Sequence, residues 1–198
     1  TECRQAIQQS CEYERGKDYA KAIAVLLPQL KDSPEQYLLN LRLGWLNYLS
    51  GTYVDAARYY EAAAKAAPAS IEAKLGATLA LLAAEQYPEA EAAARQIVAL
   101  VPKSYYGNLR LAVALRWQAK FDEARQIVLQ MLAMYPADIS LREELALLDA
   151  AQSKPEATTI ELWTANSQVR EAIRWSCQAE ERRDYSAAIK ALLGQYHS

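Results

Sequence analysis

A period of 34 residues runs through most of the chain and limits its possible folds more than any other feature. A proline, an aromatic residue, an alanine and a small residue each recur at this interval. The four columns are Pro34, Pro68, Pro102 and Pro136; Tyr19, Tyr53, Tyr87 and Phe121; Ala22, Ala56, Ala90 and Ala124; and Ser10, Gly44, Thr78, Ala112 and Ala146. Self-similarity at a fixed period of roughly 20–50 residues is typical of repeat architectures. The chain is therefore predicted to be an array of equivalent units.

Each unit is predicted to be a pair of helices. In residues 40–68, apolar side chains follow helical spacing on both sides of the short link formed by Ser50 and Gly51. A link this short allows only a tight antiparallel turn, and the proline at the end of each unit cannot continue a helix. The small column lets a neighbouring helix approach closely. We expect the aromatic column, with Tyr185 as a fifth member, to be mostly buried against these small residues.

These features resemble the tetratricopeptide repeat family, whose unit is a 34-residue helix–turn–helix with this pattern of small, aromatic, alanine and proline positions. The resemblance covers residues 3–150 and again 167–196. It implies an all-α fold, a right-handed superhelical solenoid of antiparallel helix pairs. Asn40 and Asn47 depart from the pattern, because the family usually has aromatic residues there, and Thr78 replaces its usual glycine. A shared fold does not identify a partner.

The array is predicted to occupy residues 1–152, as units 3–36, 37–70, 71–104 and 105–138 and a closing helix over 139–152. Pro155 and Thr158 stand where an aromatic residue and an alanine belong, so residues 153–166 are predicted to be a linker. Residues 167–198 are predicted to form a further hairpin that is similar to the first one. Leu192 and Leu193 are predicted to lie at the edge of this hairpin. Three alternatives are open: a natural continuation that truncation removed, a fold-back onto helix 139–152, or docking on another molecule. Truncation together with concentration-dependent self-association is favoured.

Composition argues against several classes of function. The 22 basic and 24 acidic residues leave a net charge of −2, which gives no basis for binding nucleic acid. No apolar run approaches the roughly 18 residues that a membrane span needs. Three cysteines and one histidine are too few for a disulfide framework or a zinc site, and His197 is next to last in the chain. We therefore predict no catalytic residue, no metal site, no cofactor and no enzyme activity.

The remaining ionisable and thiol groups have structural interpretations. The paired glutamates at 143–144 and 180–181 diverge around their helices and are predicted to belong to solvated charged faces. Cys11 and Cys177 are predicted to be small apolar fillers between helices. Unpaired thiols favour the reducing cytoplasm. The chain starts at Thr1 and not at methionine, so an exported mature protein is an open alternative.

The first helix of each middle unit carries the candidate binding residues. In unit two this helix is apolar nearly all round, which indicates either full burial or a face that is offered to a ligand. The resemblance implies the second option, because the first helices of the family line the concave surface. Trp, Tyr and Arg are enriched in binding hot spots. The predicted peptide-binding groove consists of Arg42, Trp45, Leu49, Leu79, Tyr106, Arg110, Val113 and Trp117.

The function predicted from these observations is a non-enzymatic scaffold that binds a protein or peptide segment in an apolar and aromatic groove. Two alternatives are open: a self-assembly module that forms homo-oligomers, and a regulatory repeat domain of a larger protein. Burial of Trp45, Tyr106 and Trp117 between repeats would exclude the groove. Relatives that bind the acidic tails of chaperones use Lys, Asn and Arg side chains. The chain has Ile7, Cys11, Arg42, Glu72 and Gly76 at those places, which argues against that ligand.

Overall fold

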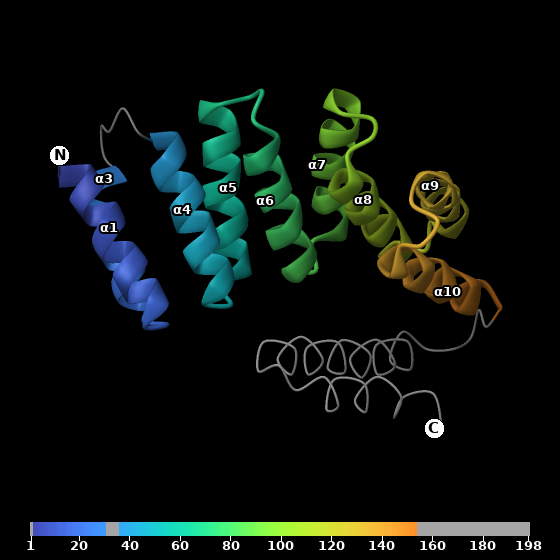
Figure 1. Ribbon diagram of the computed structural model, residues 1–198, viewed down its shortest axis with the longest axis horizontal. Coiled ribbons are helices and arrows are strands. Elements are labelled where there is room, and N and C mark those ends of the chain that lie inside the picture. The colour runs from blue at the N-terminus through green and yellow to red at the C-terminus, as the bar shows by residue number, and fades with distance from the viewer. Residues whose placement is uncertain (1, 31–35, 154–198) are drawn as a thin grey trace, which may run out of the picture. The chain divides into compact units, whose positions relative to one another are not determined.

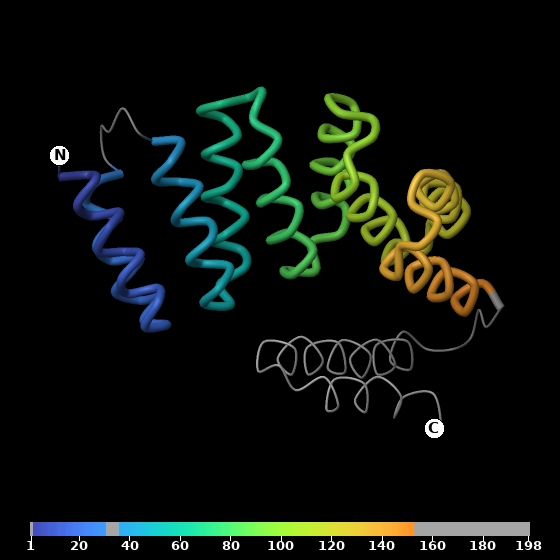
Figure 2. The backbone as a smooth tube through the Cα atoms, in the orientation of Figure 1, coloured from blue at the N-terminus to red at the C-terminus, as the bar shows by residue number. Residues whose placement is uncertain are grey.

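The computed structural model describes residues 2–30 and 36–153, and these residues form ten α-helices with no strand among them (Figure 1). The helices are α1 (Glu2–Arg15), α2 (Tyr19–Ala24), α3 (Leu27–Leu30), α4 (Gln36–Leu49), α5 (Tyr53–Ala66), α6 (Ile71–Ala83), α7 (Tyr87–Leu100), α8 (Tyr105–Trp117), α9 (Phe121–Met134) and α10 (Ile139–Ser153). Consecutive helices from α4 to α9 pack side by side, as the tube in Figure 2 traces. The first helices α4, α6 and α8 also contact one another. The predicted all-α array of helix pairs is confirmed.

The chain divides into two compact units, residues 1–145 and 146–198, with the boundary inside α10. The sequence pattern instead predicts the end of the array at residue 152. Residues 154–198 lie outside the described part, and they hold the predicted hairpin 167–198 and all but the first residue of the predicted linker 153–166. Cys177 and Tyr185 lie there too. The candidate site belongs entirely to the first unit.

In residues 2–30 and 36–153, each turn within a hairpin contains one residue in the left-handed region of backbone conformation. These residues are again 34 apart: Lys17, Gly51, Glu85 and Ala119, with φ values of 58°, 82°, 59° and 59°. The amide after each of them donates to the carbonyl five residues back, as Thr52 N does to Asn47 O at 2.9 Å. This is the Schellman way of ending a helix, and it favours glycine at the left-handed position. Only one of the four positions is a glycine, so the residue types conceal this column.

The first helices of the later units begin at a capping residue, again every 34 positions. The Ser70 and Ser104 hydroxyls and the Asp138 carboxylate accept hydrogen bonds from the amides three residues on, at 3.3, 3.2 and 2.9 Å. Such caps satisfy amides that have no partner within the helix. The start of each helix is therefore set by a local side chain.

The core combines the alanine and small columns with larger apolar side chains such as Leu43, Ile97 and Leu115. Ala22, Ala56, Ala90 and Ala124 are buried, and so are the small residues Ser10, Gly44, Thr78 and Ala112. The aromatic column is less buried than predicted, because Tyr19, Tyr87 and Phe121 are half-buried and Tyr53 is 36% exposed. The prediction is wrong for Tyr53. This residue begins its helix next to the hairpin turn and lies against Tyr48, with ring centroids 5.5 Å apart.

The second half of the first unit also differs from the prediction. In place of one continuous helix, α2 ends at Ala24 and α3 begins at Leu27. Pro28 lies just beyond the break. It has no amide hydrogen to donate to the carbonyl of Ala24, and its ring crowds that carbonyl. The break is therefore a consequence of the proline.

The two asparagines that replace aromatic residues are buried and satisfied within α4. The Asn40 amide donates to Gln36 O at 2.7 Å, and the Asn47 amide donates to Leu43 O at 2.8 Å. Asn47 Oδ1 also accepts a hydrogen bond from the Thr52 hydroxyl, at 2.8 Å. The second asparagine thus ties the end of α4 to the turn that follows it.

Glu144 corrects a further prediction, since it does not belong to a solvated face. Its carboxylate is 5% exposed and pairs with Arg116, which is 8% exposed, at 2.6 Å between Nε and Oε1. Its neighbour Glu143 is half-buried, and burial raises the pKa of that carboxyl. A pair of adjacent glutamates in the sequence does not reveal that an arginine 28 residues earlier faces one of them.

Candidate binding groove

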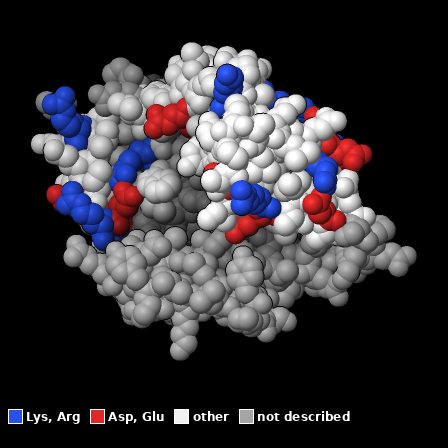
Figure 3. Space-filling model, turned by 45° about the vertical axis from the view of Figure 1, so that its right-hand side comes forward, with Lys and Arg blue, Asp and Glu red and all other residues white. Residues whose placement is uncertain are grey.

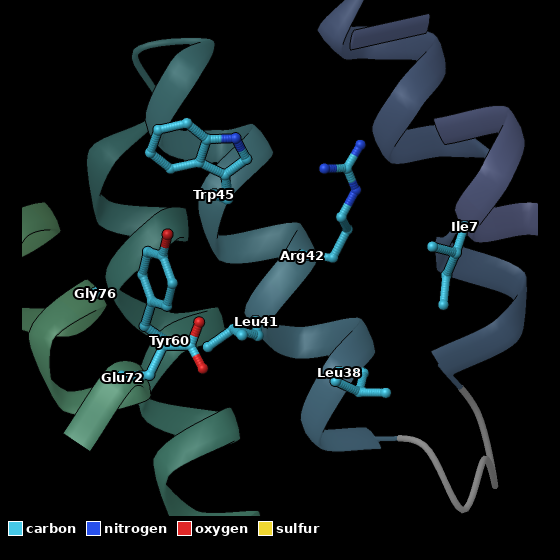
Figure 4. A pocket seen from close by; sticks show the side chains of 8 residues that line it. All are labelled: Ile7, Leu38, Leu41, Arg42, Trp45, Tyr60, Glu72 and Gly76. Carbon is cyan, nitrogen blue, oxygen red and sulfur yellow. The ribbon is translucent and has the colours of Figure 1, made fainter. Parts of the chain in front are cut away.

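A pocket of 430 Å³ lies among α1, α4, α5 and α6 (Figure 4). We call it the Tyr60 pocket. Its lining residues are Ile7, Leu38, Leu41, Arg42, Trp45, Tyr60, Glu72 and Gly76. Most of this lining is apolar, and Trp45 is 39% exposed beside it. Concave apolar sites with a few polar groups are where ligands usually bind.

The Tyr60 ring depends on two glycines for its position. A Cβ atom at Gly44 would lie 2.8 Å from Tyr60 Cγ, and one at Gly76 would overlap the same ring. The ring therefore fills the space that side chains at those two positions would occupy, and Tyr60 is only 5% exposed. Figure 4 shows the ring extending from α5 with its hydroxyl on the side of Trp45. Burial raises the pKa of this hydroxyl to about 12.

Arg42 and Trp45 are held from α1. Arg42 Nη2 lies 2.6 Å from Glu14 Oε2, and its Nε donates to the Ser10 hydroxyl at 3.2 Å. Trp45 Nε1 donates to the other oxygen of Glu14, at 2.8 Å. One carboxylate therefore fixes both a guanidinium and an indole, and it neutralises the charge that the sequence pattern offered to a ligand.

Arg110 has a different environment on α8. Its Nη1 donates to the Leu75 carbonyl and, at 3.2 Å, to the Thr78 hydroxyl, so the side chain lies against α6. The guanidinium lies 5.4 Å from the centroid of the Tyr106 ring, and this tyrosine is 56% exposed. Burial lowers the pKa of Arg110. A guanidinium over an aromatic face is a favourable contact.

The two arginines occupy identical sequence segments. Residues 40–43 and 108–111 both read Asn-Leu-Arg-Leu, 68 positions or two periods apart, and we call them the NLRL segments. The unit between them has Lys74, Leu75, Gly76 and Ala77 at the same positions. Gly76 thus stands where the neighbouring units have an arginine, and the Tyr60 ring takes the space that its side chain would occupy. A search at twice the basic period would have detected this alternation.

The other predicted groove residues are all partly covered by their neighbours. Leu49, Leu79 and Val113 are half-buried. Trp117 is half-buried too and stacks on Tyr87, with ring centroids 5.3 Å apart and the rings 7° from parallel. This tryptophan packs between repeats and does not line the Tyr60 pocket, whereas Trp45 and Tyr106 are not buried. Tyr60 itself was missed, because it belongs to a second helix; its signal was the pair of facing glycines.

Charges of both signs surround the groove. Glu72 is exposed and accepts a hydrogen bond from the Tyr37 hydroxyl at 3.3 Å. On the face in Figure 3, coloured acidic and basic side chains are interspersed, and neither sign dominates. Across residues 2–30 and 36–153, no group of three His, Cys, Asp or Glu side chains is placed to hold a metal ion. No helix in that part of the chain is long and apolar enough to cross a membrane.

Comparison with known families identifies the repeats. Family models described as tetratricopeptide repeat match residues 7–71, 47–110 and 81–148. The chain belongs to the tetratricopeptide repeat family. No curated protein matches this tetratricopeptide repeat chain with significance.

Solved structures share the tetratricopeptide repeat fold at low sequence identity. The crystal structure of MamA is 16% identical, with a TM-score of 0.64 over 94% of this chain and 92% of that one. A double mutant of MamA from RS-1 is also 16% identical, with a TM-score of 0.69 over 82% and 91%. The second such domain of human RPAP3, in complex with the HSP70 peptide SGPTIEEVD, is 23% identical, with a TM-score of 0.55 over 58% and 96%. These likenesses concern the fold alone.

Proposed function

We propose that this chain is a non-enzymatic scaffold that binds a protein segment along α4, α6 and α8, with the Tyr60 pocket as the central anchoring site. The observation that carries the proposal is the pocket of 430 Å³ beside an exposed tryptophan. Gly44 and Gly76 leave room for the Tyr60 ring, and Trp45 stands at its rim. An apolar or aromatic side chain of the partner segment would enter the pocket beside the Tyr60 ring.

The physical support for the proposal is preorganisation. The indole of Trp45 is held by Glu14 through a hydrogen bond of 2.8 Å and lies 6.0 Å from the Tyr48 ring, centroid to centroid. A side chain that is already ordered loses less conformational freedom when a ligand binds. Aromatic residues fixed in this way at the centre of an interface are the usual hot spots. Trp45 therefore has the chemistry and the setting of an anchor.

The comparisons support a peptide ligand but not its identity. The RPAP3 domain with the same fold is in complex with an HSP70 peptide that ends in Glu-Glu-Val-Asp. In this chain Glu14 neutralises Arg42, and Glu72 brings a negative charge to the pocket. A run of several acidic residues is therefore a poor ligand for the Tyr60 pocket itself.

The proposal is tested with peptides selected for binding to the full chain from a random library. Calorimetry then compares the wild type with Trp45→Ala and with Val54→Ala, a matched exposed position on α5. We expect Trp45→Ala to weaken binding by about 2 kcal/mol or more, roughly thirtyfold, and Val54→Ala to leave it unchanged. Equal affinity in all three proteins would overturn the proposal.

The same variants separate the two alternatives. A homo-oligomer in light scattering that weakens with Trp45→Ala would assign the groove to a second copy of the chain. A regulatory domain would instead bind a segment of its own longer protein, which peptides covering that protein's sequence would detect. In both cases the groove is used, but by a different occupant.

A further inference from the structure

A second cavity, of 620 Å³, lies among α5, α6 and α7, and we call it the alanine groove. Ala77 and Leu81 of α6 are 3% and 4% exposed and form its floor, and Ala64 of α5 and Ala93 of α7 belong to its walls. At roughly 100° of rotation per residue, this side of α6 is opposite the side that lines the Tyr60 pocket. The alanine groove is therefore separate from the proposed peptide site.

The groove is wide because four of its positions have alanine where the neighbouring repeats have larger side chains. These positions are 64, 77, 92 and 93. The residues one period before and after them are Leu30 and Val98, Leu43 and Leu111, Arg58 and Gln126, and Tyr59 and Ile127. The distance at which two helices pack depends on the side chains between them, so alanine walls let a further helix approach closely. The space is thus a feature of these residues and not of the repeat pattern.

Charges of opposite sign mark the two ends of the groove. Lys65 and Lys74 lie near the end of α5 and the start of α6, and Glu89 lies at the other end, in the first turn of α7. Glu61 adds a negative charge on the same side of Lys65 as Glu89. Position 89 is equivalent to Asp55, ten residues before Lys65, so Glu89 and Lys65 are roughly 15 Å apart along the groove. Among residues 2–30 and 36–153, none of the four lining charges forms an ion pair.

We propose that the alanine groove binds an amphipathic helix of a protein partner. Large apolar side chains of that helix occupy the space beside the alanines, an acidic residue pairs with Lys65, and a basic residue pairs with Glu89. Positions i, i+4, i+7 and i+11 of a helix share one face, and eleven residues span roughly 16 Å, which matches the separation of Lys65 and Glu89. The acidic residue comes first in the partner helix, because acidic side chains stabilise the start of a helix and basic ones its end. The inference goes beyond the proposed function, since it adds a second site on the opposite side of α6.

The test uses the full chain with ¹³C labels on its alanine methyl groups and a synthetic helix with acetylated and amidated ends. Its sequence is Ser-Glu-Ala-Ala-Ala-Leu-Gln-Ala-Leu-Gln-Ala-Ala-Lys-Ala, and a hydrocarbon link on the face away from the leucines keeps it helical. One control peptide exchanges the Glu and the Lys, and another replaces both leucines with alanine. NMR titration measures the affinities, and the methyl signals of Ala64, Ala92 and Ala93 report where the peptide binds.

We expect the first peptide to bind more tightly than either control peptide, by a factor of roughly ten or more, and to shift the methyl signals of the groove. Lys65→Glu combined with Glu89→Lys should invert the preference between the first peptide and the charge-exchanged one. Lys103→Glu, which alters an exposed lysine in the loop between α7 and α8, should not change that preference. Equal binding of these two peptides, or binding by none of the three, overturns the inference.

A substitution inside the groove separates it from the Tyr60 pocket. Ala93→Ile introduces the side chain that the next repeat has at this position, and it should weaken binding of the first peptide by roughly tenfold or more. Ala99→Ile, at an exposed position of α7 outside the groove, is the matched control and should leave the affinity unchanged, as should Trp45→Ala. Circular dichroism shows whether each variant is folded.

Three results from these variants contradict the inference. The first is undiminished binding by folded Ala93→Ile. The second is loss of binding in Trp45→Ala, which would place the peptide in the Tyr60 pocket. The third is a homo-oligomer in light scattering that Ala93→Ile dissociates, because a second copy of the chain would then occupy the groove.

Discussion

The NLRL segments of α4 and α8 are identical in sequence, yet their arginines have different partners. Arg42 is tied to α1 by Glu14, whereas Arg110 lies over Tyr106 and has no counter-ion in the described part of the chain. Each guanidinium donates a hydrogen bond to a hydroxyl of the small column, Ser10 for Arg42 and Thr78 for Arg110. The helix one unit earlier determines whether the guanidinium has a counter-ion, because position 14 is a glutamate and position 82, two periods later, is a leucine.

A third arginine extends the comparison to full burial. Arg116 on α8 pairs with Glu144 on α10, and the two residues are only 8% and 5% exposed. The position equivalent to Arg116 in α4 is Tyr48, which lies against Trp45 beside the Tyr60 pocket. In the described part of the chain, the α8 repeat therefore has one arginine in a buried ion pair and one without a counter-ion. The α4 repeat instead has Tyr48 packed against Trp45, which lines the pocket.

The largest expected effect is on stability and comes from removing the partner of the buried arginine. Glu144→Leu leaves Arg116 as an uncompensated buried charge and should lower the free energy of unfolding by about 3–5 kcal/mol. Arg110→Met removes a guanidinium that has no counter-ion in the described structure and should change stability by less than about 1 kcal/mol. Urea unfolding of the two variants provides the measurement. Equal losses would mean that Arg110 is also part of a stabilising ion pair.

The next effect concerns a carboxylate that is shared between repeats. Burial of Glu91 opposes its ionisation, but hydrogen bonds from Lys120, Arg95 and Gln118 outweigh burial and lower its pKa to about 2. Because the unfolded pKa is near 4.3, this stabilisation is complete above that pH and is lost as the pH falls toward 2. Unfolding free energy should therefore drop by roughly 2–3 kcal/mol between pH 5 and pH 2.

The control for that pH dependence is Glu91→Gln, which cannot titrate. Its unfolding free energy should be lower at pH 7 and should change much less between pH 5 and pH 2 than that of the wild type. An identical pH profile in both proteins would show that other carboxyl groups cause the loss.

A smaller effect tests whether the Tyr60 ring depends on Gly76, the residue that stands between the two NLRL segments at the position of their arginines. Gly76→Ala places a methyl group in the Tyr60 ring and should cost about 1–3 kcal/mol of stability through overpacking. Gly16→Ala is the matched control, because a Cβ atom there meets only the Tyr13 carbonyl, at an ordinary 3.5 Å, and the Glu12 carbonyl. Tyr60→Leu should make Gly76→Ala better tolerated, and thermal unfolding of the double variant checks this coupling. Additive losses would show that the ring does not depend on Gly76.

The smallest effect compares the turns of the same two repeats. Gly51 and Ala119 both have left-handed backbone conformations, but only glycine adopts this conformation without strain. Ala119→Gly should raise the free energy of unfolding by roughly 0.5–1 kcal/mol, and Gly51→Ala should lower it by a similar amount. Thermal unfolding of both variants measures the difference. Losses in both would mean that the extra freedom of glycine in the unfolded chain outweighs the relief of strain.

Much of the fold was predictable from the sequence because its determinants are local and periodic. The alanine column marks the buried face of each second helix, and the prolines and capping residues mark where helices stop and start. The 34-residue period then places equivalent faces against each other, so hairpins such as α4 with α5 and α8 with α9 follow directly. Where a local rule changed the outcome, as Pro28 did between α2 and α3, the cause was also visible in the sequence.

The candidate site was predictable only in part. Its tryptophan and two arginines were identified from residue type and helical position, but Tyr60 was not, because its place depends on two glycines that belong to other helices. Tertiary structure alone decided that Glu14 neutralises Arg42, that Glu144 is buried and that Trp117 stacks on Tyr87. Each of these outcomes depends on which side chain the adjoining helix presents about 30 residues away. A period in the sequence specifies that two helices meet, whereas the chemistry of their contact is specified by the individual residues that come together when they do.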